Sequence, residues 1–401
     1  MRSTRVCLVL VLVLTVEGLA MQPSGKQVVN VGPSRDLPFS SAVKAGGLVY
    51  VSGTLATDAK NQIVPGDIKA QTKQVLDNLA AALKAAGSSM DNVASVNVYI
   101  KNAADFAAMN EVYRTYWPKD PPVRTTITAN LVRPEGLVEM SMIAIPNDRE
   151  RQVIHPADWM KSPNPYSYGI KSGDTLFLAG LVSRNGRDNS VIEGDITKQT
   201  RTVLDNGGEI LKAAGMTFAD VAAARVYITD TALFQDMNAA YRPYFATGAL
   251  PARATVRAGL MGAQYLVEIT MTAVRGNHEP FTTPAADGTP GKPGPNFSSA
   301  IRVGNRLWVS GTLGSTESNK GDGGAQTRET LARIGRTLKV AGFDFANVVE
   351  GVVFLTDLKN YDPMNQAYRG SIAKDFPARA TVQAGLVVPD GLVEIMLTAV
   401  K

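Results

Sequence analysis

The sequence predicts an α+β protein built from three tandem copies of one unit, and three repeated patterns support this. An arginine at the start of a strand-like run recurs three times, and a glutamate follows each arginine after fifteen residues. Each copy has one helix ending in Ala-Gly and a second helix with the motif Met-Asn-x-x-Tyr-Arg. Because whole helices and strands recur in the same order, we predict domains and not a solenoid of short repeats.

Each copy of the unit is expected to run β-β-α-β-α-β-β. Two strands joined by a glycine-rich turn come first, as in Ser40–Ala56, and a helix, a strand and the second helix follow. The arginine strand and the glutamate strand complete the unit. We predict domains at residues 21–147, 148–277 and 278–401, with linkers around Pro146–Met160 and Asn277–Asn296. Three like units on one chain predict a pseudo-threefold ring.

The first twenty residues differ from the rest of the chain. Arg2 and Arg5 precede an apolar run from Val6 to Val16, and small residues follow. This pattern predicts a secretory signal over residues 1–20, and hence a secreted or periplasmic protein. The run is short for a bilayer span, so a retained membrane tether is the weaker alternative, and we expect no stable membrane insertion after cleavage.

Composition excludes several classes of chemistry. The one cysteine, Cys7, lies in the predicted signal, which excludes disulfides and thiolate nucleophiles from the mature chain. The two histidines, His155 and His278, fall in the linkers and do not recur, so we expect neither a metal site nor a Ser-His-Asp triad. The net charge of +5 is scattered along the chain, which argues against a nucleic-acid-binding protein.

The recurring arginine and glutamate are the main candidates for a functional site. The pairs are Arg124 with Glu139, Arg253 with Glu268, and Arg379 with Glu394. A guanidinium at the end of a polar strand face is suited to bidentate capture of a carboxylate. A glutamate in an apolar strand has a raised pKa unless a cation is close, and it can then transfer protons near neutrality.

A structural salt bridge is the alternative interpretation of these charges. A tight hairpin centred on Asp390 would place Arg379 opposite Lys401 and not opposite Glu394, which weakens the bridge, although bulges or non-adjacent strands would restore it. The residues alone leave the two interpretations open. The asparagines of the second helix, Asn110, Asn238 and Asn365, and the aromatic residues Phe39, Tyr166 and Phe297 are structural by default.

These motifs together resemble the RidA (YjgF-type) family of reactive enamine/imine deaminases. The resemblance rests on the Arg-x-Thr and Val-Glu block, on Val-Ser-Gly-Thr at a strand end, and on Met-Asn-x-x-Tyr in the second helix, and it covers nearly the whole mature chain. It implies chorismate-mutase-like units, which in the usual member form a homotrimer with sites at subunit interfaces. We therefore expect this chain to act as a monomer that is an intramolecular pseudo-trimer.

The resemblance implies roles for particular residues. The arginines would bind the substrate carboxylate, and Glu139, Glu268 and Glu394 would hold water as the catalytic groups. Further substrate-binding positions would be Asn110, Asn238, Asn365, Ser52, Ser310 and Tyr166. Phe39 and Phe297 replace the pocket tyrosine, and Ala179 replaces the serine of the second unit, so the activity of all three sites is an open question.

The implied reaction is hydrolytic deamination of 2-imino or 2-enamino acids to 2-keto acids and ammonia, without a cofactor. One alternative is a binding module for small carboxylic acids that turns nothing over. The other is an activity on RNA, which the family's older name, endoribonuclease L-PSP, suggests. We expect a small-molecule partner and no nucleic acid.

Overall fold

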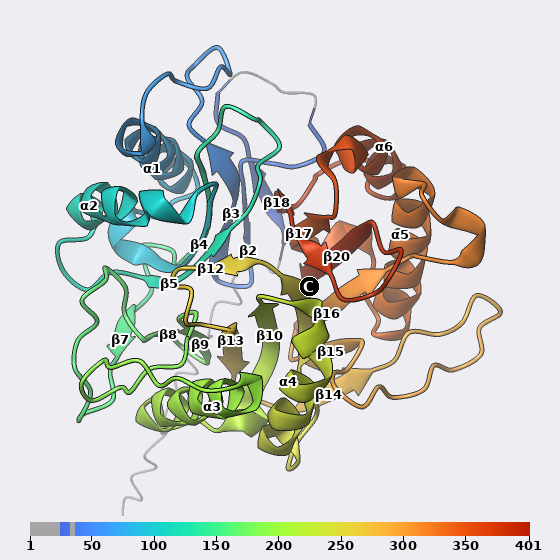
Figure 1. Ribbon diagram of the computed structural model, residues 1–401. Coiled ribbons are helices and arrows are strands. Elements are labelled where there is room, and N and C mark those ends of the chain that lie inside the picture. The colour runs from blue at the N-terminus through green and yellow to red at the C-terminus, as the bar shows by residue number, and fades with distance from the viewer. Residues whose placement is uncertain (1–24, 33–36) are drawn as a thin grey trace, which may run out of the picture.

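The computed structural model describes residues 25–32 and 37–401, which form three sheet-and-helix units around a common centre (Figure 1). The helices lie on the outside and the sheets face the middle, as expected for three packed α+β units. The predicted signal segment, residues 1–20, lies outside the described residues. No helix in the described ranges is long and apolar enough to cross a bilayer.

The first unit has six strands and two helices. They are β1 (Gln27–Val29), β2 (Ala42–Ala45), β3 (Leu48–Leu55), α1 (Ile68–Ala85), β4 (Val93–Ile100), α2 (Phe106–Tyr116), β5 (Val123–Thr128) and β6 (Val138–Ala144). Their order confirms the predicted β-β-α-β-α-β-β arrangement and adds one short edge strand, β1, in front of it.

The second and third units repeat this order, each with one further short strand. The second has β7 (Gln152–Ile154), β8 (Gly169–Ser172), β9 (Thr175–Leu178), α3 (Ile196–Ala213), β10 (Val221–Ile228), α4 (Phe234–Tyr241), β11 (Ala252–Arg257), β12 (Gly259–Leu260) and β13 (Val267–Val274). The third has β14 (His278–Phe281), β15 (Ala300–Val303), β16 (Arg306–Leu313), α5 (Gly323–Val340), β17 (Val348–Leu355), α6 (Tyr361–Ser371), β18 (Ala378–Gln383), β19 (Gly385–Leu386) and β20 (Val393–Val400).

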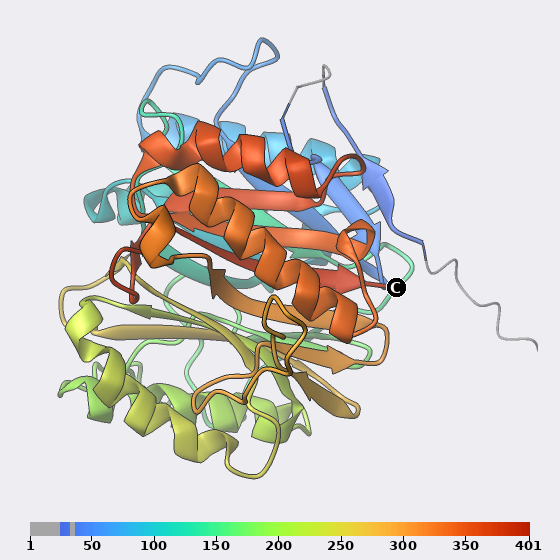
Figure 2. The same ribbon diagram turned by 90° about the vertical axis from the view of Figure 1, so that its right-hand side faces the viewer.

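The long first helix of each unit begins and ends at residues that the sequence marks. An aspartate accepts a backbone N–H at each N-terminus, for example Asp195 from Lys198 at 2.8 Å. A glycine with positive φ follows each C-terminus, namely Gly87, Gly215 and Gly342, which confirms the predicted caps. Between these ends an apolar face packs on the sheet, and Figure 2 shows α5 and α6 lying across the sheet of the third unit.

The arginine strand and the glutamate strand of one unit are not neighbours in the sheet. In the third unit β17 lies between them, parallel to β18 and antiparallel to β20. Arg379 is aligned with Gly351 and Glu394 with Phe354, so a strand separates the two charged residues. The turn at Asp390 therefore joins non-adjacent strands and does not form a hairpin.

Short strands join the units into a closed ring. β12 of the second unit pairs with β5 of the first, and β19 of the third pairs with β11 of the second. A bridge between Leu131 and Val382 joins the first unit to the third. Each unit thus extends the sheet of the unit before it, which gives the pseudo-threefold ring that the repeats predict.

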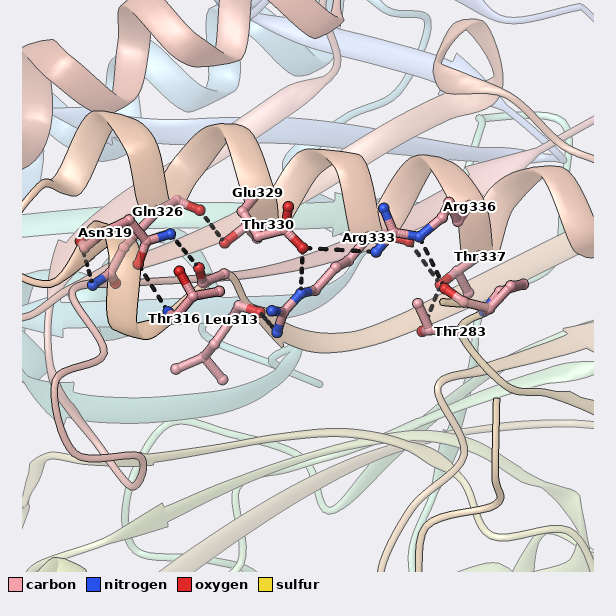
Figure 3. A network of polar contacts seen from close by, with 12 residues as sticks. Thr283, Leu313, Thr316, Asn319, Gln326, Glu329, Thr330, Arg333, Arg336 and Thr337 are labelled. Atoms are coloured by element: carbon pink, nitrogen blue, oxygen red, sulfur yellow. Dashed lines mark hydrogen bonds and ion pairs between the residues drawn. The ribbon is translucent and has the colours of Figure 1, made fainter. Parts of the chain in front are cut away.

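The predicted linkers are partly ordered by contacts with the units. Each contains a short edge strand, β7 or β14. The second linker also packs on α5, where the hydroxyls of Thr283 and Thr337 lie 2.7 Å apart (Figure 3) and Arg336 Nε donates to the carbonyl of Pro284. His278 lies on β14, and within the described ranges no cluster of three or more His, Cys, Asp or Glu residues has metal-binding geometry.

Candidate functional site

The ring places the arginine of one unit and the glutamate of the next unit at the same interface. We call these the first site (Arg124 with Glu268), the second site (Arg253 with Glu394) and the third site (Arg379 with Glu139). In each site the two charges interact: burial raises the pKa of the glutamate, and the positive charge of the arginine reduces this rise. All six side chains are buried.

The direct salt bridge considered from sequence is not formed in these sites. None of the ion pairs in the described part of the chain joins one of these arginines to one of these glutamates. Glu394 Oε2 and Arg379 Nε are buried without a hydrogen-bond partner among the described residues. Buried groups of this kind retain the capacity to bind a ligand or water.

Each guanidinium is held in place by an asparagine from the second helix of its own unit. The hydrogen bonds to the asparagine Oδ1 run from Arg124 to Asn110 (2.7 Å), from Arg253 to Asn238 (2.6 Å) and from Arg379 to Asn365 (2.6 Å). The asparagine orients the arginine without neutralising it, because an amide carries no charge. All three predicted asparagines therefore lie at the sites.

Each guanidinium also packs on a tyrosine one helical turn beyond that asparagine. The distances from the guanidinium carbon to the ring centroid are 4.8 Å for Tyr113, 4.7 Å for Tyr241 and 4.9 Å for Tyr368. A cation is stabilised over an aromatic face, which suits a buried arginine whose pKa burial lowers. The recurring tyrosine of the motif Met-Asn-x-x-Tyr is the sequence signal for this contact, although the sequence alone did not indicate its role.

The aromatic residues near the start of each unit also reach these interfaces. The ring centroid of Phe39 lies 5.3 Å from the guanidinium carbon of Arg379, and that of Phe297 lies 5.5 Å from the guanidinium carbon of Arg253. In both sites the phenylalanine belongs to the unit that follows the arginine's unit around the ring. Tyr166 interacts electrostatically with both Arg124 and Glu268, so it belongs to the first site. All three aromatic positions singled out from sequence are therefore brought to the sites.

The two serines join backbones across the interfaces. Ser52 Oγ accepts the backbone N–H of Arg379 at 2.8 Å, and Ser310 Oγ accepts that of Arg253 at 2.8 Å. Each hydroxyl also donates to a carbonyl in its own unit. In the first site Ala179 stands at this position, and the neighbouring Gly180 N–H donates instead to the carbonyl of Arg124 at 3.0 Å.

Burial sets the protonation of the three glutamates. It raises the pKa of Glu139, Glu268 and Glu394 to about 8, and the site arginines and backbone N–H groups reduce this rise. The N–H of Thr126, for example, donates to Glu268 Oε1 at 3.3 Å. A carboxyl with a pKa near 8 can both accept and release a proton close to neutral pH.

A glycine faces each of these carboxylates, and the sequence reasoning missed its role. A Cβ at Gly53, Gly180 or Gly311 would collide with the Oε1 of Glu139, Glu268 or Glu394. Gly53 and Gly311 lie where the strand register shifts, between Val51 and Thr54 and between Val309 and Thr312. The glycine after the serine in Val-Ser-Gly-Thr was the available signal.

The third site opens into a cavity of about 550 Å³. Arg379, Glu139, Ser52, Phe39 and Thr381 are among the residues that line it, together with residues of the loop after β3 and of α1. It contains an arginine and a titratable carboxyl but, in the described ranges, no metal-binding cluster. The arrangement suits a small carboxylic acid that reacts by proton transfer.

Comparison with known proteins agrees with the repeat and the site motifs. The model of the endoribonuclease L-PSP family matches three segments, residues 31–146, 157–275 and 290–401. The chain belongs to this family. It is a tandem array of three RidA-like units, as the sequence resemblance predicted.

Relatives and solved structures of this family match one unit at a time. A RutC family protein from Pyrococcus horikoshii is 44% identical over 108 residues, which are 27% of this chain and 86% of that protein. RidA from the Antarctic bacterium Psychrobacter sp. PAMC 21119 is 33% identical, with a TM-score of 0.28 and coverage of 30% of this chain and 98% of that chain.

A chorismatase matches a larger part of the chain. It is 15% identical, with a TM-score of 0.52, and the match covers 77% of this chain and 93% of that chain. At this identity the similarity concerns the fold alone, and it supports the packing of several such units within a single chain.

Proposed function

We propose that this protein hydrolyses reactive 2-imino or 2-enamino acids to 2-keto acids and ammonia. The observation that carries the proposal is the pairing, at each unit interface, of an oriented buried arginine with a glutamate whose pKa is raised to about 8. Among the described residues no carboxylate forms an ion pair with this arginine, so it supplies the binding energy for an anionic substrate.

In the proposed reaction the arginine holds the substrate carboxylate and thereby fixes the imine carbon. An enamine substrate first takes a proton on carbon from the neutral glutamic acid, which gives the iminium and a carboxylate. The carboxylate then accepts a proton as water adds to the iminium carbon. The glutamic acid next gives this proton to nitrogen. The resulting carboxylate takes the hydroxyl proton as the C–N bond breaks, so the 2-keto acid and ammonia leave and the neutral glutamic acid is restored. By fixing the orientation of the substrate, the arginine lowers the activation barrier of the reaction.

The test is release of ammonia from 2-iminobutyrate made in situ by an amino-acid oxidase. We expect each of Arg124→Ala, Arg253→Ala and Arg379→Ala to remove the activity of one site, and the triple variant to lose roughly 10- to 100-fold in total rate. Arg328→Ala, on the exposed face of α5, is the matched control. Full activity in a folded triple variant contradicts the proposal.

A second set of variants separates catalysis from binding. Glu139→Gln, Glu268→Gln and Glu394→Gln together keep the shape of the sites but remove the titrating group, so we expect 2-oxobutyrate to bind while turnover is lost. Binding by the wild type without ammonia release would instead support a carboxylic-acid binding module. A labelled RNA substrate belongs in the same assay because of the family model's name, and its cleavage would contradict the deaminase proposal.

We further propose that the protein is exported and acts as a single chain. The basis for export is the pattern of residues 1–20, and N-terminal sequencing of protein secreted by cells tests it. The basis for the monomer is the closed ring, in which each unit already has both neighbours. Sedimentation should give the mass of one chain.

A further inference from the structure

The third-site cavity is larger than a three- or four-carbon imino acid requires. Its volume is about 550 Å³, which falls within the range of pockets that hold drug-sized ligands. Arg379 and Glu139 are each only 3% exposed, whereas Arg133 and Asn61 of the same lining are half-buried, so the two pairs mark an inner and an outer end of the cavity. A ligand whose carboxylate is held by Arg379 can therefore carry a longer side chain toward the outer end.

A second arginine, Arg133, lines the outer part of the same cavity. It is half-buried, and its Nη2 donates to the carbonyl of Asn61 at 3.3 Å. Among the described residues no carboxylate forms an ion pair with it. Asp58 also lines the cavity, but its Oδ1 already accepts the N–H groups of Lys60 and Gln62, both at 2.9 Å.

The corresponding turn of the second unit also carries an arginine that is not ion-paired in the described structure. Arg184 Nη1 donates to the carbonyl of Asn189 at 2.8 Å, and Asn189, like Asn61, has a positive φ. Arg184 comes from the segment after β9, whereas Arg133 comes from the segment after β5. Two units thus place a guanidinium on the same turn from different positions in the sequence.

The third unit, which faces the second site, differs. Val388 stands where the first unit has Arg133, counting back from the site glutamate. Arg333 occupies the α5 position that matches Asn78 of α1, but its Nε forms an ion pair with Glu329 at 2.8 Å (Figure 3). Among the described residues, the matching positions of the second site therefore supply no arginine without an ion pair, and the second site serves as an internal control.

We propose that the third site selects 2-imino and 2-keto acids that carry a second acidic group, with Arg379 holding the first carboxylate and Arg133 the second. A partly buried arginine without an acidic partner gains a charge-assisted hydrogen bond from such a ligand, whereas an apolar end would leave it unpaired. The inference deepens the proposed function and rests on it for the class of ligand.

The test measures binding of unreactive 2-keto acids by calorimetry to the full chain carrying Arg124→Ala and Arg253→Ala, which leaves the third site. The ligands are 2-oxoglutarate and 2-oxoadipate, with 2-oxohexanoate as the matched acid without a distal charge. We expect at least one dicarboxylate to bind about tenfold more tightly than 2-oxohexanoate, and 0.5 M NaCl to reduce this ratio.

Variants of Arg133 identify the source of the preference. In the same background Arg133→Gln should reduce the ratio of affinities to about one, and Arg133→Lys should retain part of it because the charge remains. The chain carrying Arg124→Ala and Arg379→Ala keeps only the second site and should show no preference. Equal binding of the three ligands, a preference that survives Arg133→Gln, or no binding at all overturns the inference.

The outcome is separable from that of the proposed function. The dicarboxylate preference is measured with products and needs no turnover, whereas ammonia release is measured with 2-iminobutyrate, which has no distal charge. A preference without ammonia release would refute the deaminase and keep the selectivity. Ammonia release without a preference for dicarboxylates would support the deaminase and refute the selectivity.

Discussion

At the scale of single residues, a glycine opposite each glutamate decides whether the carboxyl fits. A Cβ at Gly53 would meet both Glu139 Oε1 and, at 3.0 Å, the backbone Cα of Ala380 in another unit. We expect Gly53→Ala to cost about 1–3 kcal/mol of stability, because the strand cannot move away from both, and to inactivate the third site. Urea denaturation and the ammonia assay measure the two effects.

Gly370 in α6 is the matched control, since nothing lies within 4 Å of an added Cβ there. Gly370→Ala should leave stability unchanged or raise it by up to about 1 kcal/mol, because alanine favours a helix. Equal effects of the two substitutions would show that the contact with Glu139 is unimportant.

The raised pKa of the three glutamates makes stability depend on pH. The folded protein retains protons up to a pKa of about 8, whereas the ordinary carboxyl of the unfolded chain has a pKa of 4.5. The stabilisation of the folded protein by these three groups is therefore fully present below pH 4.5 and is lost as the pH rises to about 8. Each can change the free energy of unfolding by up to about 1.4 kcal/mol per pH unit.

Denaturation at pH 5, 6.5 and 8 tests this dependence. The wild type should lose stability across the series, and the variant with all three glutamates changed to glutamine should show a flatter profile, because glutamine does not titrate. Parallel profiles for the two proteins would mean that other groups cause the dependence.

At the scale of elements, a serine hydroxyl connects strands of different units. Ser52 of β3 accepts the N–H of Arg379 in β18, and Ala179 stands at the matching position of the first site. We expect Ser52→Ala to destabilise the protein by about 1–3 kcal/mol, because it leaves a buried N–H unpaired. Thermal or urea unfolding measures the change.

Ala179→Ser is the reciprocal variant, and it should not destabilise as strongly, since no backbone group loses a partner. If Ala179→Ser lowered the free energy of unfolding as much as Ser52→Ala, steric crowding and not the hydrogen bond would determine stability at this position.

At the scale of the whole molecule, the ring is asymmetric at its centre. A cavity of about 60 Å³ there is lined by residues of all three units, among them Arg225 and Glu350. Arg225 Nη2 donates to Asn97 Oδ1 at 2.9 Å, while the position that matches both in the third unit is Val352. Three identical units would bring like side chains together at this point, so the fused chain allows a pairing that a symmetric trimer cannot form.

Coupling between Arg225 and Glu350 follows from this placement, because each charge affects the pKa of the other. Arg225→Met and Glu350→Leu should each destabilise, by about 1–3 kcal/mol, and the double variant should cost less than their sum. A double-mutant cycle by urea denaturation measures the difference. Strict additivity would show that the two charges act independently.

Much of the fold follows from local patterns. Helical periodicity, the glycine at the helix end and the threefold recurrence of Arg and Glu can be recognised from the sequence alone, so the sequence predicted the units and their order. The edge strands β7 and β14 were not predicted, because strands this short are stabilised by pairing with distant residues and lie among Pro, Thr and Asn.

The sequence by itself singled out the recurring arginines and glutamates, and the resemblance to a known family added the asparagines. The structure brings these residues and the aromatic positions to the interfaces, together with glycines and tyrosines that the sequence did not single out as site residues. Only the tertiary structure decided that Glu394 faces Arg253 and not Arg379. The physical reason is that β17 separates β18 from β20 within one unit, while ring closure brings the next unit's glutamate to the interface. Partners in space follow from sheet order, which spacing along the chain does not contain.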